Sequence, residues 1–183
     1  MNVIKHSTKG AILGILLFVF FIVGTTQGCM GKETPAGGIP AVGSAAPDFT
    51  LTNLEGKSVR LSDLRGRIVF LNFWATWCPP CKEEMPSIES LKVKMSGEDF
   101  SIVAVSVDGV SSGEVRAYMN NNGYTFEVLH DQAQKIAETY LVTGIPTTFI
   151  IDKDGIIVEV SRGSESWDSI ERLKQFRSLC AAQ

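Results

Sequence analysis

Apolar and polar positions alternate in two different periods along residues 47–183, which predicts strands interleaved with helices. Nearly continuous apolar runs at 68–74 and 100–107 indicate strands buried on both faces, as in the middle of a parallel or mixed sheet. Apolar residues at helical spacing predict helices over 83–95, 113–121, 133–141 and 167–179. A short strand is expected over 125–129, after the glycine that ends the second helix.

Two hairpins are predicted from turn residues that separate alternating segments. The first joins 48–52 to 58–61 with Gly56 at its turn, and the second joins 147–151 to 156–160 around Asp152-Lys-Asp-Gly155. An N-terminal hairpin, alternating strands and helices, and a terminal hairpin and helix together predict an α/β fold. We expect a three-layer α/β/α sandwich with a mixed sheet.

The first 28 residues have the pattern of an export signal. Lys5 and Lys9 carry positive charge without any nearby acid, and the uninterrupted apolar run 11–24 follows. This run is shorter than the roughly 20 residues that a membrane-spanning helix needs, which favours a processed leader. Residues 29–46 are rich in Gly, Pro and Ala and predict a flexible linker. We therefore expect a leader or anchor (1–28), a linker (29–46) and one extracytoplasmic domain (47–183).

The segment Thr26-Gln27-Gly28-Cys29 resembles the lipobox of bacterial lipoproteins, in which the cysteine becomes lipid-modified. Gly28 fits the small residue of that pattern, whereas Thr26 stands where a leucine-like residue is usual. Lipid attachment at Cys29, an uncleaved helical anchor and free secretion remain open. The first two place the domain beside a membrane.

Composition narrows the function classes. The formal net charge is −3 and the sequence has no basic block, so nucleic acid is not expected as a partner. Of the four cysteines, Cys78 and Cys81 are three residues apart and the other two stand alone. This spacing does not suit a disulfide framework. We expect Cys180 to be a lone buried or half-exposed thiol.

The chemistry centres on Cys78-Pro79-Pro80-Cys81, at the junction of a buried strand and a helix. The unpaired N–H groups and the dipole of a helix start stabilise a thiolate, which is the form that attacks disulfides. Cys81, nearly one turn later, can resolve a mixed disulfide by closing the intramolecular bond. Trp77 would shield one side of the pair.

Other uses of the pair are weaker. Zinc needs four ligands, and only His130 lies outside the predicted leader. Copper held by the two thiolates and His130 remains an alternative, as does a structural disulfide, although such a small loop stabilises little. A peroxiredoxin-like peroxidase is a further alternative, but no Pro-x-x-x-Thr-x-x-Cys stretch precedes the pair. Redox exchange needs no metal and no bound cofactor, so we expect none.

Two segments, Asn72–Pro86 and Gly144–Asp152, resemble the thioredoxin superfamily and, more narrowly, its TlpA- and ResA-type membrane-anchored thiol–disulfide oxidoreductases. The resemblance implies a thioredoxin-like fold with a helix–strand insert over 113–131. It also implies that Cys78 is the exposed nucleophile and that Cys81 is the buried resolving thiol. It further implies a cis Ile145-Pro146 bond in a loop that, with Trp77 and Pro79, faces the substrate. Pro86 would then be the helix-kinking proline of that superfamily.

Glu84 is the third predicted catalytic residue. In cytosolic thioredoxin an acid occupies the strand position of Asn72, which cannot accept a proton. Glu84 follows Cys81 by one helical turn and could point back toward the pair, exchanging a proton with it. The alternative is that Glu83 and Glu84 are both solvated acids of the helix start; for Glu83 we expect this.

The resemblance implies an extracytoplasmic reductant of protein disulfides, recharged by a membrane thiol reductase. Oxidised haem-binding sites of apocytochromes c are one expected substrate, which would place the protein in cytochrome c maturation. The remaining alternatives are the peroxidase named above and a copper-binding oxidase assembly factor.

Overall fold

A computed structural model describes residues 39–182 of the chain. The predicted leader or anchor (1–28), the lipid-attachment candidate Cys29 and the linker up to residue 38 lie outside the described residues. Within the described range, every helix is too short or too polar to cross a bilayer.

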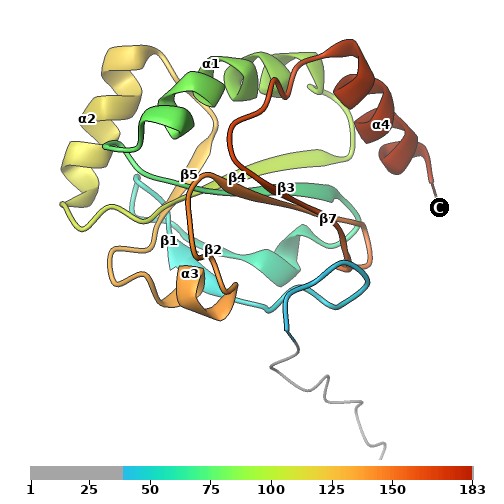
Figure 1. The fold of residues 1–183 in the computed structure, drawn as a ribbon, viewed down its shortest axis with the longest axis horizontal. Coiled ribbons are helices and arrows are strands. Elements are labelled where there is room, and N and C mark those ends of the chain that lie inside the picture. The colour runs from blue at the N-terminus through green and yellow to red at the C-terminus, as the bar shows by residue number, and fades with distance from the viewer. Residues whose placement is uncertain (1–38, 183) are drawn as a thin grey trace, which may run out of the picture. The chain divides into compact units, whose positions relative to one another are not determined.

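A five-stranded mixed sheet forms the middle layer, with strands in the order β5-β4-β3-β6-β7 (Figure 1). Its centre is β3, in which all seven residues are buried. The bounds are β3 (Ile68–Trp74), β4 (Phe100–Ser106), β5 (Glu127–His130), β6 (Thr147–Ile151) and β7 (Ile157–Arg162). β4 lies parallel to both β3 and β5, whereas β6 lies antiparallel to both β3 and β7. The carboxyl ends of β3, β4 and β5 therefore share one edge of the sheet.

Helices and a hairpin cover the two faces of this sheet (Figure 1). One face carries α1 (Pro79–Lys94), α2 (Ser112–Asn122) and α4 (Ile170–Ala181). The other carries α3 (Lys135–Thr139), the short 3-10 helix η1 (Leu61–Leu64) and a separate hairpin of β1 (Thr50–Thr52) and β2 (Ser58–Arg60). This arrangement confirms the predicted three-layer α/β sandwich with a mixed sheet, an N-terminal hairpin and the α2–β5 insert.

Local chemistry explains where the insert helix begins and ends. Ser111 caps α2 through its side chain, which accepts from the Glu114 backbone N–H, and the Ser111 backbone N–H donates to the Glu114 carboxylate. Gly123 ends the helix with a positive φ of 71°, a conformation that costs glycine little.

The last helix begins later than the sequence pattern predicts. α4 starts at Ile170, because Ser169 is its N-cap and accepts a hydrogen bond from the Arg172 backbone N–H. Trp167, expected inside the helix, lies in the loop before it and is fully buried. α3 is also shorter than its predicted range of 133–141.

The predicted linker ends earlier than residue 46. The Gly43 N–H donates to the Ile157 carbonyl (2.8 Å) and the Ala46 N–H to the Gly155 carbonyl (2.9 Å). Ala46 is buried. Composition alone indicated a spacer here, but backbone groups of the β6–β7 hairpin pair with this segment and draw it into the domain.

The start of the domain is also held by Tyr140. Its ring packs edge-on against Phe49 and Phe149, and its hydroxyl donates to the Pro47 carbonyl at 2.7 Å. The side chain is 1% exposed, so the carbonyl has little access to water as a substitute partner.

We expect Tyr140→Phe to lower the free energy of unfolding by about 1 kcal/mol, because one buried hydrogen bond is lost while the ring remains. Urea denaturation of the oxidised protein measures this difference. Tyr124→Phe is the matched control, since the Tyr124 hydroxyl makes no hydrogen bond within residues 39–182 and should lose far less stability. Equal losses in the two variants would contradict the assignment.

Candidate active site

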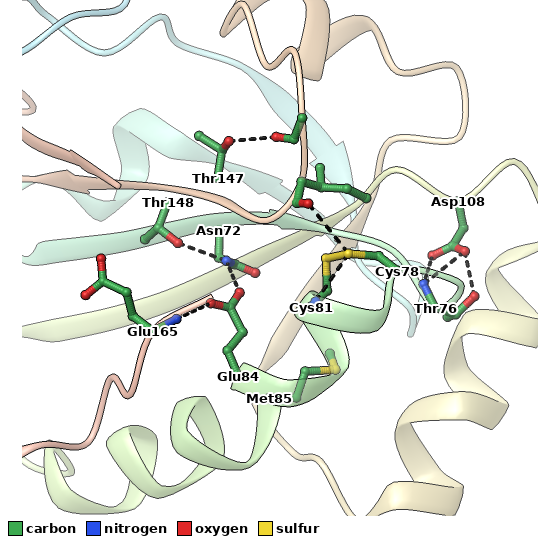
Figure 2. The surroundings of a disulfide bond; sticks show 12 residues. Asn72, Thr76, Cys78, Cys81, Glu84, Met85, Asp108, Thr147, Thr148 and Glu165 are labelled. Atoms are coloured by element: carbon green, nitrogen blue, oxygen red, sulfur yellow. Dashed lines mark hydrogen bonds between the residues drawn. A yellow bond between two sulfur atoms is a disulfide. The ribbon is translucent and has the colours of Figure 1, made fainter. Parts of the chain in front are cut away.

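Cys78 and Cys81 are joined by a disulfide at the point where β3 leads into α1 (Figure 2). Cys78 is the N-cap of the helix and has an extended backbone, and Pro79 and Pro80 occupy the first helical positions. The Cys81 backbone N–H donates to the Cys78 sulfur at 3.2 Å. A thiolate formed at Cys78 would therefore meet an unpaired helix-start N–H that is already directed at it.

Cys78 is less accessible than the resemblance implies. It is 3% exposed and Cys81 is 0% exposed, so the expectation of an exposed nucleophile is wrong for this disulfide form. The order of the two is as expected, with Cys81 the deeper residue. The physical reason is that the Cys78 sulfur is bonded on one side and faces a loop on another.

That loop contains the cis peptide bond Ile145-Pro146, as the resemblance implies. The Ile145 carbonyl oxygen lies 3.7 Å from the Cys78 sulfur. Because a disulfide sulfur carries no hydrogen, this is a van der Waals contact here and becomes a hydrogen bond only when Cys78 is a thiol. The loop is braced by Thr147, whose hydroxyl donates to the Gly144 carbonyl at 2.7 Å.

The surface beside the pair is apolar. Trp77 is 63% exposed, and Pro79 and Pro80 are also exposed. Trp77 thus presents most of its indole to solvent. A substrate-binding role was predicted for Trp77 and Pro79, together with Ile145 and Pro146, and that role stays a prediction.

Glu84 is buried, which rules out the alternative of a solvated helix-start acid for this residue. It is 1% exposed, whereas its neighbour Glu83 is exposed as expected. Its carboxylate accepts hydrogen bonds from Asn72 Nδ2 (2.9 Å), Trp167 Nε1 (2.9 Å) and the Glu165 backbone N–H (3.4 Å). Figure 2 shows Asn72 and Glu165 at different oxygens of this carboxylate.

The local environment favours the protonated form of Glu84. Burial raises the pKa of this carboxyl from its ordinary 4.5 to about 7, and the hydrogen bonds from Trp167 and Asn72 oppose that rise only in part. Glu84 therefore changes charge near neutral pH. It lies on the buried face of α1 that also carries Cys81, three residues earlier.

Asn72 links the helix to the sheet. It is 1% exposed on β3, and its amide nitrogen donates both to Glu84 and to the Thr148 hydroxyl on β6 (2.9 Å each). The two donors of one amide group are thus both used. The position that holds an acid in cytosolic thioredoxin here holds a side chain that binds an acid.

Asp108 is a site residue that the sequence analysis missed. It is 0% exposed, and its carboxylate accepts from the Thr76 backbone N–H (3.0 Å) and the Thr76 hydroxyl (2.6 Å), just ahead of the cysteine pair (Figure 2). The Ser106 hydroxyl adds a third bond at 2.8 Å. The available signal was topological, because Asp108 follows β4 and parallel neighbours end at the same edge.

Two further candidates from the sequence analysis are His130 and Cys180. His130 Nε2 is 3.0 Å from the Asp108 carbonyl oxygen, and residues 39–182 contain no cluster of three or more side chains suited to a metal ion. Cys180 is buried and its sulfur lies 3.5 Å from the Asp99 carbonyl, at the amino end of β4. Burial raises the pKa of this thiol. Because Asp99 precedes β4, Cys180 lies at the sheet edge opposite the Cys78/Cys81 pair.

A disulfide at a helix start, faced by a cis-proline loop and backed by a buried acid, defines a thioredoxin-type dithiol–disulfide exchange protein. Residues 42–160 match the model of the AhpC/TSA family. The chain is 43% identical over 130 residues to the thiol-disulfide oxidoreductase ResA of Bacillus thuringiensis (strain Al Hakam), covering 71% of this chain and 75% of that one. It is 39% identical to ResA of Bacillus subtilis (strain 168), covering 82% and 83%.

Solved structures agree. A putative thiol:disulfide interchange protein DsbE from Chlorobium tepidum superposes with a TM-score of 0.70 at 31% identity, covering 77% of this chain and 99% of that one. The chain thus belongs to the AhpC/TSA family and, within the thioredoxin superfamily, to the ResA-like thiol–disulfide oxidoreductases. It is an enzyme that exchanges electrons between its cysteine pair and other thiols or disulfides.

Removing the Asp108 carboxylate should weaken the support of the active-site loop. We expect Asp108→Ala to lower the free energy of unfolding by about 1–3 kcal/mol, since it leaves the Thr76 N–H without its acceptor. Asp108→Asn keeps one acceptor oxygen and should lose less. Urea denaturation of the oxidised proteins compares them, and an Asn variant as unstable as the Ala variant would contradict this assignment.

Burial of Glu84 should make stability pH-dependent. Its folded-state pKa of about 7 exceeds the ordinary 4.5, so the folded protein binds this proton more tightly. The resulting stabilisation is complete below about pH 4.5 and is lost as the pH rises through about 7, by at most about 3 kcal/mol. Unfolding measured from about pH 5 to about pH 8 should show this loss in the wild type and not in Glu84→Gln.

Glu83→Gln is the matched control, because Glu83 is the exposed neighbour on the same helix. It should keep the pH dependence of the wild type. A Glu84→Gln variant with the wild-type pH dependence would show that another group is responsible.

Proposed function

We propose that this enzyme reduces disulfides of other proteins outside the cytoplasm, from a membrane-anchored position. The observation that carries the proposal is the buried Glu84 carboxyl on the helix face of the buried Cys81. A reductant must remove the proton of its resolving thiol at the moment of release. A carboxyl with a pKa of about 7 is an acceptor suited to that task at neutral pH.

The exchange proceeds in two displacements. The Cys78 thiolate attacks one sulfur of the substrate disulfide, so that a mixed disulfide forms and the second substrate sulfur leaves as a thiolate. Cys81 then passes its proton toward Glu84 and attacks the Cys78 sulfur, which releases the first substrate sulfur as a thiolate. The substrate gains two electrons, and the enzyme is left with the Cys78–Cys81 disulfide.

The exposed apolar residues beside the pair suit the binding of an unfolded or extended substrate. Trp77 and Pro79 are exposed neighbours of Cys78 in the sequence, and the Ile145 carbonyl of the cis-proline loop contacts the Cys78 sulfur. Cys78 is 3% exposed in the disulfide form, so we expect a substrate to approach the pair closely at these residues. Flexible chain segments meet that requirement more readily than the surface of a folded domain.

Apocytochromes c, whose haem-binding cysteines oxidise outside the cytoplasm, are the substrate class that we favour. The membership in the ResA-like group and the N-terminal leader pattern support this choice. A membrane thiol reductase would return electrons to the pair. Lipid at Cys29 or a retained N-terminal helix would hold the enzyme near that donor.

The reduction potential of the pair tests the direction of transfer. We expect a value near about −270 mV after equilibration in dithiothreitol or glutathione buffers, as for a dedicated reductant. A value near about −120 mV marks a disulfide-donating oxidant and would overturn the proposal.

Trapping tests the substrate. Cys81→Ser should accumulate mixed disulfides through Cys78, because the resolving thiol is gone, and mass spectrometry of membranes carrying the full chain identifies the partner. Cys180→Ser added to this variant should leave the trapped species unchanged, since Cys180 lies at the opposite sheet edge. Partners that never include apocytochrome c would remove cytochrome maturation from the proposal.

A further inference from the structure

The acid of this active site is held by groups that do not belong to its own helix. One donor is Asn72 of β3, and two come from the loop between β7 and α4, namely the Trp167 indole and the Glu165 backbone. We propose that Trp167 is a positioning residue, which holds Glu84 in place as an anion for the exchange reaction of the Cys78/Cys81 pair. The inference rests on the role of Glu84 in the proposed function.

Trp167 differs from Asn72 in what it can do when Glu84 gains a proton. The Asn72 amide can turn so that its oxygen accepts from the protonated carboxyl, and it therefore suits both charge states. The indole nitrogen is a donor only. An N–H donor binds a carboxylate more strongly than the carbonyl oxygen of a neutral carboxyl group, so its 2.9 Å bond to Glu84 Oε2 favours the charged form. Of the two side-chain donors, Trp167 is the one that cannot turn to accept the proton of the neutral carboxyl, and its hydrogen bond opposes the rise of the Glu84 pKa more than that of Asn72 does.

The indole is fixed in its orientation. Trp167 is 0% exposed, and its ring packs edge-on against Phe70 with centroids 4.8 Å apart. Its backbone N–H donates to the Ser87 hydroxyl (3.1 Å), one turn beyond Glu84 on α1. The residue is therefore attached to the helix that carries the acid and to the sheet beneath it.

Arg172 of α4 also contacts the Trp167 ring and the loop that carries it. Its guanidinium lies over the Trp167 ring, 4.8 Å from the centroid, a favourable cation–π geometry. The same guanidinium pairs with Glu165 and, at 2.7 Å, with Glu159. Arg172 thus ties the loop at both residues that donate to Glu84.

The charges around Glu84 explain why a neutral donor matters here. Glu165 from the β7–α4 loop is the charged group facing it, and its negative charge raises the pKa of Glu84 further. On the buried face of α1, Cys81 is held uncharged in the disulfide, and Asn72 and Thr148 from β3 and β6 are neutral. Within residues 39–182 no cation forms an ion pair with Glu84. Stabilisation of its anion therefore depends on N–H donors.

The test is Trp167→Phe, which keeps an aromatic ring and removes the donor. Titration of the Glu84 carboxyl carbon by NMR in the oxidised full chain should show its pKa rising by about one unit above the wild-type value. The pH at which disulfide exchange reaches half its maximal rate should rise with it. Trp74→Phe is the matched control, because Trp74 is also buried but its indole N–H has no partner in the described part of the chain.

Arg172→Gln provides a second variant should Trp167→Phe fold poorly. It leaves the Trp167 indole in place and removes the ion pairs and the cation–π contact of Arg172. The Glu84 pKa should therefore rise, but by less than in Trp167→Phe. An unchanged or lowered Glu84 pKa in Trp167→Phe overturns the positioning role, as does an equal rise in Trp74→Phe. A raised pKa with an unchanged exchange profile supports the positioning of Glu84 and contradicts its role in exchange, so the two failures are distinguishable.

Discussion

The burial of one carboxyl group organises this active site. Glu84 is 1% exposed, and its oxygens are met by donors from β3 and from the loop before α4. Such a group is costly to bury as an anion unless it is hydrogen-bonded, and here neutral N–H groups meet that need. Segments far apart in the chain thereby converge behind the cysteine pair. The same balance leaves the proton of Glu84 exchangeable near neutral pH.

The parallel strands at the centre of the sheet place the remaining parts. β3 and β4 run in the same direction, so the cysteine loop after one strand and Asp108 after the other lie at one edge. Asp108 accepts hydrogen bonds from Thr76, and α1 begins three residues later with the Cys81 N–H directed at the Cys78 sulfur. Cys78 is thus positioned by the end of β3 and the start of α1, and its sulfur contacts the Ile145 carbonyl of the cis-proline loop.

Sequence patterns were sufficient where local chemistry decides the structure. The bounds of β3 and β6 agree with the predicted ranges. Both strands are buried on both faces, so their side chains are apolar or hydrogen-bonded along the whole strand and the strand ends are marked in the sequence. Glu84 was identified from its spacing to Cys81. Trp167, Asp108 and the pairing of Gly43 were missed, since each is determined by a partner distant in the chain. The exposure of Cys78 was misjudged for the same reason, because a distant loop contacts it.

The pairing of Gly43 and Ala46 with the β6–β7 hairpin has a practical consequence for handling the enzyme. That hairpin turn follows Ile151, which pairs with Val69 near the start of β3, whereas the disulfide follows the end of β3. The first residues of the described domain therefore lie at the end of the sheet opposite the reactive sulfur atoms. A dye, an affinity handle or a solid support attached just ahead of Gly43 would leave the redox-active end free, and a substituent at the C-terminal end of β3 would not.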